Sequence, residues 1–516
     1  MQPKPDQTQT RVSVAAGAQA TGDPGTAAAS ETSYVGPPRE GRFDWLPMEL
    51  SAGAWLVILL GIISTVAVWV WPEREIEGLS MWIFAKNHHE MYQPLLIEYN
   101  DSLDNEKPPV TSMLLDGNAL TRRMLSGFMS DTPVADLIEV EQGVVGRVFS
   151  GPLEDVGFVD LTDLLKEEGI YEQINEPSFS QWSTRGRIFG IPHDVHPVVL
   201  AYRADILEDQ LGIDMQSIET WDEFFDKTRF AQDPDNDGEA ERYLLNLWYT
   251  NSQVHELLLM QAGGGFFDED DNLTIDTELN ARVMATMMSW MVGPDRVAID
   301  AAEFSGPGNE MRLNGTVLTA LMPDWLAGSY AMNLPQMSGK WKIMPLPSWQ
   351  PGGLRTSVMG GTMLGITKQT DDFDQAWDAA KMLYLSPEVA KKLYEVSYII
   401  SPIKTMWDLP FYHEPSEYFG GQKVGQVFID LAPNVPRRSS SPFREMARGE
   451  FANAMTRLYE LATDNDKPLH TVDALLPEAQ RLLERAQADV ERQMARNVFV
   501  SDALGETTSG GEEADQ

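Results

Sequence analysis

The sequence contains no cysteine in 516 residues. This absence excludes disulfide bonds, thiolate metal ligands, a cysteine nucleophile and a lipid-bearing cysteine near the N-terminus. Basic residues are also scarce, since 39 Lys and Arg stand against 78 Asp and Glu, which gives a formal net charge of −39. So large a negative charge opposes binding to a polyanion over a broad surface, and nucleic acid is therefore not an expected partner.

The negative charge belongs mainly to the interior of the chain. Residues 1–51 carry a net charge of −2 and residues 502–516 a net charge of −5, so −32 remains between them. Such a charge favours neutral ligands and argues against anionic ones unless a local basic patch intervenes.

Signatures of common enzyme classes are missing as well. The sequence has no GxSxG elbow, no HExxH motif and no GxxxxGK[ST] phosphate loop, so hydrolase, zinc-protease and nucleotide-hydrolysing functions lack their motifs. Paired carboxylates are abundant, but a glycosidase needs a specific separation between them that a sequence does not show. The protein is therefore not expected to be an enzyme.

One long apolar stretch interrupts this polar chain. Residues 52–71 contain no charged side chain, and a helix of about 20 apolar residues spans the hydrocarbon core of a bilayer. A cleaved signal peptide would begin closer to the N-terminus and end at a small-residue site, which the following WPEREIEG lacks. We expect a disordered arm over residues 1–51, a single transmembrane helix over 52–71 and a disordered acidic tail over 502–516.

The residues after the span alternate between strand-like and helical patterns. Strand-like segments at 81–85, 110–117 and 135–141 are separated by helical segments, which predicts an α/β fold with a parallel sheet. Ligands of such sheets bind beyond the carboxyl ends of the strands. The last helical segment carries one apolar face, formed by Leu475, Leu482, Leu483, Ala486 and Val490.

Several segments between about residues 78 and 500 resemble, in their order and spacing, the extracellular solute-binding proteins of ABC importers, in particular the sugar-binding, maltose-binding-protein-like family. The segments that carry the resemblance are GRIFGIPHDVHPVVLAYRADILEDQLGID (186–214), ETWDEFF (219–225), QAGGGFFDEDDNLTID (261–276), RLNGTVLTALMPDWLAGSY (312–330), WKIMPLPSWQPGGLRTSVMGGTMLGIT (341–367) and DFDQAWDAAKMLYLSPEVAKKLYE (372–395).

The resemblance implies a two-lobed periplasmic-binding-protein-like fold of the class II type, with a hinge of about three crossings that closes around a solute. It places the N-lobe at 78–194 and 355–400 and the C-lobe at 195–354 and 401–501. It also implies a location outside the cytoplasmic membrane, where the receptor delivers a small solute, expected to be a sugar or oligosaccharide, to ABC permease subunits. Charge alone does not orient the span, and the family's usual cleaved signal or lipid anchor is replaced here by residues 52–71.

A sugar site needs aromatic faces and hydrogen-bonding side chains. Trp325, preceded by Asp324, stands where the family has a binding tryptophan, whereas Trp248, Tyr249 and Trp407 fit ligand contact and core packing equally well. Trp221 and Trp377 lie in helical patterns and are expected in the core. The polar candidates follow strand ends or lie at crossings, and with the glycine of the return crossing they are Lys86, Asn87, Asp116, Asn118, Glu141, Asp194 and Gly361.

Two groups of residues raise the question of a metal ion. His88, His89, His193 and His196 form His-His and His-x-x-His pairs, but the sequence gives them neither a carboxylate nor a third ligand, so a metal is not expected there. Asp233, Asp235 and Asp237 precede Gly238 as in a calcium loop, although position 12 is Leu244. The sequence allows structural calcium at this loop but favours a solvated acidic turn.

Two further functions remain open at this stage. The same binding fold could serve a sensory or scaffold protein that signals through the span and the N-terminal arm. A carbohydrate-active enzyme is the third hypothesis. The sequence does not name the solute, the permease, the oligomeric state or the purpose of the arm.

Overall fold

The computed structural model describes residues 51–70, 78–103, 109–268, 270–464 and 466–496. The chain divides into two units, Met1–Glu75 and Ile76–Gln516. The predicted N-terminal arm, apart from its last residue, and the predicted acidic tail both lie outside the described residues.

The first unit contains the helix α1 (Ala52–Val70), which coincides with the predicted apolar segment except for its last residue. The helix starts after Ser51, whose hydroxyl accepts a hydrogen bond from the backbone N–H of Ala54 at 3.3 Å. Within the part of the chain that the structure describes, no helix meets both the length and the apolarity that a membrane span requires. The transmembrane span therefore stays a prediction.

The second unit begins with a sheet in the strand order β2-β1-β3-β12-β6. Strand β1 (Leu79–Ile83) pairs in parallel with both β2 (Val110–Leu114) and β3 (Leu137–Glu141). Strand β12 (Thr362–Ile366), more than 200 residues later, pairs antiparallel with β3 and with β6 (Ile191–Pro192). The predicted strand-helix-strand order and the parallel pairing of its strands are both confirmed.

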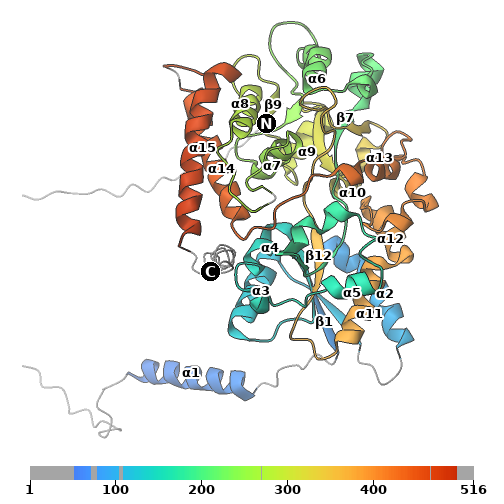
Figure 1. Ribbon diagram of the computed structural model, residues 1–516, viewed down its shortest axis with the longest axis vertical. Coiled ribbons are helices and arrows are strands. Elements are labelled where there is room, and N and C mark those ends of the chain that lie inside the picture. Colours follow the sequence, from blue (N-terminus) through green and yellow to red (C-terminus); the bar gives the residue numbers. More distant parts are fainter. Residues whose placement is uncertain (1–50, 71–77, 104–108, 269, 465, 497–516) are drawn as a thin grey trace, which may run out of the picture. The chain divides into compact units, whose positions relative to one another are not determined.

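Helices cover this first sheet as expected of an α/β fold. In Figure 1, α3 (Gly117–Ser130) and α4 (Gln142–Val148) lie on one side of β1 and β12, whereas α2 (Lys86–Ser102), α5 (Thr162–Glu167) and α11 (Phe373–Leu385) lie on the other. Helix α3 begins at Asp116, whose carboxylate accepts the backbone N–H groups of Asn118 and Ala119.

A second sheet of three antiparallel strands follows, in the order β10-β7-β11. Its central strand β7 (Val198–Arg203) is buried on both faces and lies between β10 (Thr319–Pro323) and β11 (Trp341–Pro345). Because side chains alternate along a strand, Val199 and Ala201 pack into the apolar cluster that includes the first sheet, while Val198, Leu200 and Tyr202 pack into a second cluster.

Helices α8 (Glu278–Met291), α14 (Arg444–Ala462) and α15 (Val472–Met494) pack against one another and enclose the second cluster (Figure 1). The five apolar residues predicted to form one face of the last helix are all buried there. That prediction is confirmed.

Three connections link the two sheets. Residues 193–197 lead from β6 to β7, and residues 346–361 lead from β11 back to β12. Residues 435–443 lead from the turn η9 (Ala432–Asn434), which packs on η2 (Glu176–Trp182), to α14. The first two connections include the predicted lobe boundaries at 194/195 and 354/355, whereas the third lies beyond the predicted boundary at 400/401, because residues such as Phe419 and Phe428 still pack with the first sheet's cluster. The lobe boundaries stay a prediction.

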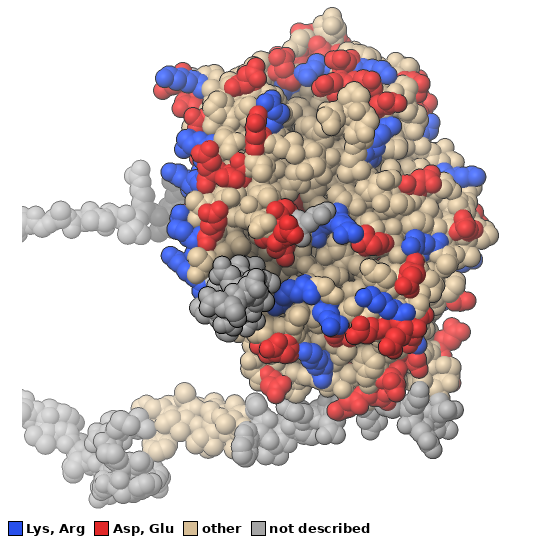
Figure 2. All heavy atoms as spheres, in the orientation of Figure 1, with Lys and Arg blue, Asp and Glu red and all other residues tan. Residues whose placement is uncertain are grey.

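The remaining helices and strands are shorter or peripheral. They are β4 (Ser183–Thr184), β5 (Arg187–Ile188), α6 (Trp221–Thr228), β8 (Leu245–Asn246), α7 (Ser252–Gln261), β9 (Ala298–Ile299), α9 (Gly306–Asn314), α10 (Asp324–Asn333), α12 (Pro387–Ser397) and α13 (Val424–Leu431). Figure 2 shows acidic side chains spread over the visible face of the second unit, with basic side chains interspersed among them.

Candidate functional site

A cavity of about 640 Å³ lies between three segments that are far apart in the sequence. One wall comes from residues 162–188, a second from residues 260–271 and a third from residues 436–440. The first wall precedes the crossing at 193–197, the second follows helix α7, and the third belongs to the crossing at 435–443. A cavity of this size, formed where separate parts of a chain meet, is typical of a small-molecule site.

Aromatic rings form part of the cavity wall. The rings of Tyr171 and Phe179 are stacked, with their centroids 5.2 Å apart and an interplanar angle of 13°. The Lys166 ammonium lies 5.7 Å from the centre of the Tyr171 ring, and Phe267 lines the wall that follows helix α7. The hydroxyl side chains of this cavity belong to Thr162, Ser180, Ser183, Thr184, Ser439 and Ser440.

Arg438 lines the same cavity but extends its guanidinium into the protein interior, where the residue is 5% exposed. Its Nη1 donates to the side-chain oxygens of Gln142 at 3.1 Å and of Gln181 at 3.2 Å. The guanidinium also donates to two backbone carbonyls, Gly360 at 3.1 Å and Val358 at 2.9 Å. All of these acceptors are neutral, and the Nε of Arg438 has no hydrogen-bond partner among the described residues.

A second buried arginine lies beside it. Arg444 makes a two-pronged contact with Glu256, at 2.9 Å from Nε and 2.7 Å from Nη2, and donates to Gln142 at 2.8 Å. Burial, together with the charge of Arg444, lowers the pKa of Arg438 to about 10. Burial alone would raise the pKa of Glu256, but Arg444, Arg438 and Arg448 together outweigh burial and lower that pKa. Gln142 at the start of helix α4, beside the first sheet, and Glu256 of helix α7, beside the second sheet, are thus linked through Arg444.

A cavity of about 280 Å³ at the carboxyl ends of the first sheet collects Asp116, Asn118 and Glu141, three of the predicted ligand residues. The carboxylates of Asp116 and Glu141 also accept hydrogen bonds from the backbone: Asp116 caps α3, and Glu141 accepts the N–H of Gly143 at 2.9 Å. Burial raises the pKa of Glu141. The prediction that strand ends gather polar side chains is confirmed for these three residues, and a role in ligand binding stays a prediction.

Two other predicted residues, Asp194 and Asp324, are buried and line neither cavity. The Nδ1 of His196 lies 2.9 Å from the Asp194 carboxylate. Asp324 accepts the backbone N–H groups of Trp325 at 2.9 Å and of Ile400 at 3.2 Å. Burial, and next the charge of Asp194, raises the pKa of Asp324 well above its usual range. The two carboxylates therefore lie close enough to repel each other, Asp194 on the first crossing and Asp324 at the start of helix α10.

Trp325 is half-buried against the return crossing. Its Nε1 donates to the carbonyl of Met359 at 3.1 Å, and its ring stacks on the exposed ring of Phe304 at 6.3 Å and 21°. The predicted Gly361 has a φ of 130°, and a Cβ there would lie 2.3 Å from Gln181 Nε2. Glycine is therefore required sterically at this position, next to the Arg438 network.

The other aromatic candidates pack within the protein. Trp248 and Tyr249 both contact Tyr459, and the Tyr249 and Tyr459 rings stack at 4.0 Å. Trp407 donates its Nε1 to the carbonyl of Ser401 at 2.9 Å. None of these three candidates lines the two cavities described above, so the packing interpretation fits them better.

The remaining candidates lie at the start of helix α2 or in the core. Lys86 is exposed and pairs with Glu90 at 3.5 Å, and Asn87 follows it in the first turn. Neither Lys86 nor Asn87 lines the two cavities. Trp221 and Trp377 are buried in the core, as expected from their helical patterns.

A model of the bacterial extracellular solute-binding protein family matches residues 115–390, which is more than half of the chain. The chain belongs to this family.

Individual relatives and solved structures agree with this assignment. The arabinooligosaccharide-binding protein of Halalkalibacterium halodurans is 25% identical over 427 residues, which cover 80% of this chain and 90% of the relative. The sugar-binding protein MalE of Xanthomonas citri has a TM-score of 0.64 at 17% identity, covering 81% of this chain and 99% of its own. A binding protein of B. animalis subsp. lactis in complex with β-1,6-galactobiose has a TM-score of 0.60 at 16% identity, covering 81% and 99%. The predicted solute-binding fold is thereby confirmed.

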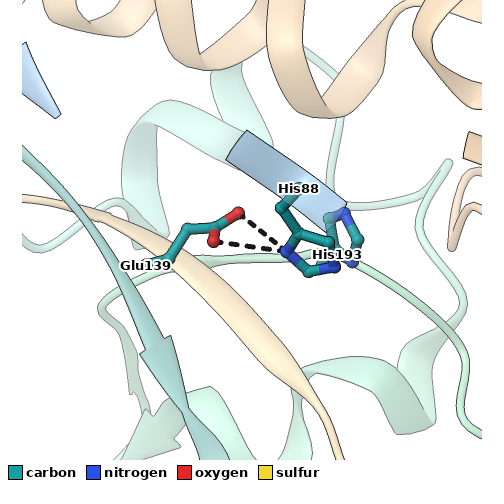
Figure 3. Close-up of side chains that lie close together, drawn as sticks. All are labelled: His88, Glu139 and His193. Atoms are coloured by element: carbon teal, nitrogen blue, oxygen red, sulfur yellow. Dashed lines mark hydrogen bonds and ion pairs between the residues drawn. The ribbon is translucent and has the colours of Figure 1, made fainter. Parts of the chain in front are cut away.

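A buried polar cluster inside the first sheet of this family member was not expected (Figure 3). His88 comes from the first turn of α2, Glu139 from β3, and His193 follows β6. The Nδ1 of His88 lies 3.2 and 3.3 Å from the two Glu139 oxygens, and the His88 and His193 rings are 4.4 Å apart. Tyr92 bonds the Nε2 of His193 at 2.9 Å, and Tyr384 donates to Glu139 at 2.8 Å.

The cluster supplies the carboxylate that the sequence did not reveal. Burial alone would lower the pKa of His88, but Glu139 raises it above its usual value, whereas burial and His88 lower the pKa of His193 to about 4. The ligand atoms of His88, Glu139 and His193 lie within 4.8 Å of one another, and so, as a separate group, do those of Asp194, His196 and Asp324. His89 takes no part in either group, since its Nδ1 lies 3.2 Å from the Ser112 hydroxyl. His88 and Glu139 already satisfy each other as an ion pair, so the described geometry explains this cluster without a metal.

In the predicted calcium loop, an acidic side chain accepts hydrogen bonds from the backbone of the loop itself. Asp233 accepts the N–H groups of Asp237 at 3.1 Å and of Gly238 at 2.9 Å. The carboxylates of Asp233, Asp235 and Asp237 come within 4.8 Å of one another, but Leu244 at position 12 is buried in the core. Structural calcium stays a prediction, and the acidic turn accounts for the described contacts.

Sequence reasoning missed the buried polar network beside the cavity, of which Arg438 lines the cavity. The network consists of Gln142, Gln181, Glu256, Arg438 and Arg444. A signal was present, because RRSSSPFR (437–444) holds three arginines within eight residues of a chain with twice as many acids as bases. A basic cluster in so acidic a chain indicates a local function for positive charge. Gln142, Gln181 and Glu256 carry no comparable signal.

Proposed function

We propose that this solute-binding protein is an extracytoplasmic receptor that captures a carbohydrate in the 640 Å³ cavity and delivers it to an ABC permease. The observation that carries the proposal is the position of the cavity, which is lined by residues before the first crossing, by residues after helix α7 and by the third crossing. A ligand held there contacts segments on both sides of the hinge connections, so its binding favours the closed arrangement.

The chemistry of the cavity suits a sugar. Tyr171, whose half-buried ring stacks on the buried Phe179, offers an aromatic contact for the C–H face of a pyranose or furanose. Five of the six Ser and Thr hydroxyls around it already donate within the protein, so they serve mainly as acceptors for the hydroxyl groups of the sugar. Relatives named as arabinooligosaccharide-binding and lactose-binding proteins support the same ligand class. A volume of about 640 Å³ has room for more than a single sugar ring.

Sugar binding is expected to raise the thermal midpoint of the full-length chain. A ligand present at 100 times its dissociation constant adds about 2.7 kcal/mol to the free energy of unfolding. The measurement is a thermal-shift screen with arabinooligosaccharides, lactose, β-1,6-galactobiose and maltooligosaccharides, followed by calorimetric titration of each positive ligand. A shift with peptides or polyamines and with no sugar would contradict the proposal.

Two substitutions locate the site. Tyr171→Ala removes an aromatic face of the cavity and is expected to weaken sugar binding by about 3- to 10-fold, because an aromatic contact contributes about 0.5–1.5 kcal/mol. Trp325→Ala is the matched comparison, since Trp325 lines the return crossing instead of this cavity. If Trp325→Ala abolishes binding in a folded protein while Tyr171→Ala leaves it unchanged, the sugar binds elsewhere.

We further propose that residues 52–71 anchor the receptor in the cytoplasmic membrane, with the second unit on the outer side. Helix α1 contains no charged residue over Ala52–Val70, and large apolar side chains such as Leu56, Val57 and Ile62 are more than half exposed along it. Exposed apolar side chains of this density favour a lipid environment.

The full-length protein is expected to sediment with membranes and to resist extraction by alkaline carbonate. Replacing Leu59 and Ile62 with lysine is expected to release it, because a lysine at the centre of a span costs about 2.5–3.5 kcal/mol on insertion scales. Fractionation followed by immunoblotting measures both outcomes. A native protein found wholly in the supernatant would contradict the anchor while leaving sugar binding intact.

A further inference from the structure

The charges that line the 640 Å³ cavity differ from those of the chain as a whole. The cavity is lined by four basic residues, Lys166, Arg185, Arg437 and Arg438, and by three acidic ones, Glu176, Asp268 and Asp271. The complete chain, by contrast, has twice as many acids as bases. The local basic patch that the sequence left open is therefore present, and it lies in the candidate solute site.

Three of these four bases have no carboxylate oxygen within 4.0 Å among the described residues, whereas Arg437 pairs with Glu176. Arg185 donates to the backbone carbonyls of Phe149 at 3.2 Å and Gly151 at 2.9 Å. Lys166 lies over the Tyr171 ring. The hydrogen-bond and ring partners that the structure gives Lys166, Arg185 and Arg438 are thus neutral groups, although acids are plentiful elsewhere on the protein.

The other two acidic residues of the cavity accept hydrogen bonds from neighbouring protein groups. Asp268 accepts the backbone N–H groups of Asp270 and Asn272, and Asp271 accepts the hydroxyl of Ser439 at 3.0 Å. Through these hydrogen bonds the Asp268 carboxylate faces its own loop, and the Asp271 carboxylate faces Ser439 of the third crossing. Asp271 still attracts Arg185 electrostatically, but no carboxylate oxygen among the described residues lies within 4.0 Å of Lys166, Arg185 or Arg438.

Arg438 gives the strongest reason to expect an anionic ligand in this cavity. A buried guanidinium without a carboxylate partner keeps much of its desolvation cost, and four neutral acceptors offset only part of it. The neighbouring Arg444 adds repulsion, and its own carboxylate partners are Glu256 and Glu445. An anionic group supplied by the ligand would offset this charge.

The backbone conformation of Arg185 also supports an anionic ligand. Arg185 and Gly186 occupy the tip of the β4–β5 hairpin with φ values of 48° and 75°. Such turns favour Asn or Asp followed by Gly at these two positions, since a long side chain with positive φ costs energy. An arginine at the first position is explained if its positive charge binds the ligand in the cavity that it lines.

We propose that the solute is an acidic oligosaccharide whose uronic acid carboxylate binds the Arg438 and Arg185 side of the cavity. This inference rests on the proposed sugar-binding function. A C6 carboxylate offers two oxygens to a guanidinium and forms charge-assisted hydrogen bonds, while the remaining sugar rings stay neutral and contact the aromatic wall.

The test compares matched sugars on the full-length chain by calorimetric titration. Two pairs differ by one glucuronate residue: xylooligosaccharides with and without a glucuronic acid branch, and arabinogalactan oligosaccharides with and without terminal glucuronate. The third pair, trigalacturonate against its methyl ester, keeps the same three rings and therefore isolates the effect of the carboxylate charge. The expected result is that the acidic member of at least one pair binds at least 10-fold more tightly than its neutral partner. This preference is expected to shrink as ionic strength rises.

Variants of the cavity test which residues carry the preference. Arg185→Gln and Lys166→Gln are expected to reduce it several-fold, and Arg438→Gln to remove it. Because Arg438 also holds structural hydrogen bonds, the two exposed positions keep the test valid if that variant fails to fold. Arg282→Gln, on the exposed face of α8 and outside the cavity, is the control and is expected to change nothing.

The outcomes separate this inference from the function on which it rests. If neutral sugars bind and no uronate binds more tightly, the acidic ligand is wrong and sugar binding stands. If no sugar of either kind binds, sugar binding itself is wrong. An acidic preference that survives all three cavity variants would also overturn the inference, since the charge would then be recognised elsewhere.

Discussion

Replacing Glu256 with glutamine is expected to lower the free energy of unfolding by about 3–5 kcal/mol. Glu256 and Arg444 are both about 95% buried and meet through two hydrogen bonds of 2.9 and 2.7 Å. The substitution removes the two-pronged partner of Arg444 and leaves the buried guanidinium with Glu445, at 3.0 Å, as its carboxylate partner among the described residues. The equally buried Arg438 lies beside it. Denaturant unfolding at pH 7, followed by circular dichroism, measures the loss.

An exposed ion pair provides the matched control for this prediction. Glu395 pairs with Lys391 at 3.6 Å, and both side chains are 55% exposed, so Glu395→Gln is expected to change stability by less than about 0.5 kcal/mol. Replacing both buried partners together, with Glu256→Leu and Arg444→Met, is expected to cost less than Glu256→Gln alone, because no unpaired charge remains. Equal losses at positions 256 and 395 would contradict a buried bridge between the sheets.

Acid is expected to destabilise the protein in a way that His255→Gln partly removes. His255 is fully buried in helix α7, where its Nε2 donates to the Trp248 carbonyl at 2.8 Å. Burial lowers the pKa of His255 from 6.5 to about 4, and the bond to Trp248 opposes this only in part. The imidazole is therefore neutral in the folded protein over the range in which it is protonated in the unfolded chain.

The direction of the effect follows from this difference in pKa. Above pH 6.5 neither state binds the proton, and the full stability is present. Between pH 6.5 and about 4 the unfolded state gains a proton that the folded state does not, so the free energy of unfolding falls as the pH falls. One pKa unit corresponds to about 1.4 kcal/mol, so His255 accounts for about 3 kcal/mol of this loss.

Denaturant unfolding at several pH values between 4 and 7 measures the slope. The His255→Gln variant is expected to lose less stability over this range than the unsubstituted protein, by about 3 kcal/mol, whatever its stability at pH 7. His193 acts in the same direction, since burial and the neighbouring His88 lower its pKa to about 4 as well. His413→Gln, at a half-buried position, is the control, and a slope unchanged by His255→Gln would show that His255 is accessible to protons in the folded state.

Much of the fold could be predicted from the sequence because its signals are local. The strands near 79–83, 110–114 and 137–141 show as short apolar segments, and the capped start of helix α6 shows in ETWDEFF, where Thr220 accepts the N–H of Glu223 at 3.2 Å. The antiparallel pairing of β12 with β3 joins residues more than 200 positions apart. The resemblance to the family predicted only the return of residues 355–400 to the N-lobe, and the antiparallel pairing itself was not predicted, since no local pattern indicates it.

The site was harder to predict because most of its contacts are long-range. Asp116, Asn118 and Glu141 were found because strand ends of a parallel sheet meet at one edge, and the structure does bring them together. Gln142 and Gln181 acquire their significance only from Arg438, which lies about 250 to 300 residues later. A glutamine in a helix carries no sign of such a partner.

Net charge was informative at the level of the chain and misleading at the level of the cavity. The value of −39 correctly describes the acidic surface visible in Figure 2. The same number favours a neutral solute, whereas the cavity wall carries three bases without a carboxylate partner among the described residues. Local potential depends on which side chains the fold collects, and a sum over 516 residues does not contain that information.

The central claim is that a carbohydrate binds in the cavity formed by residues 162–188, 260–271 and 436–440. A crystal structure of the protein with the tightest-binding oligosaccharide from the titrations tests it most directly. The account predicts sugar density in this cavity, with a ring against Tyr171 and an oxygen within hydrogen-bonding distance of Arg438 or Arg185. Density instead in the cavity of Asp116, Asn118 and Glu141, or against Trp325 alone, would contradict it.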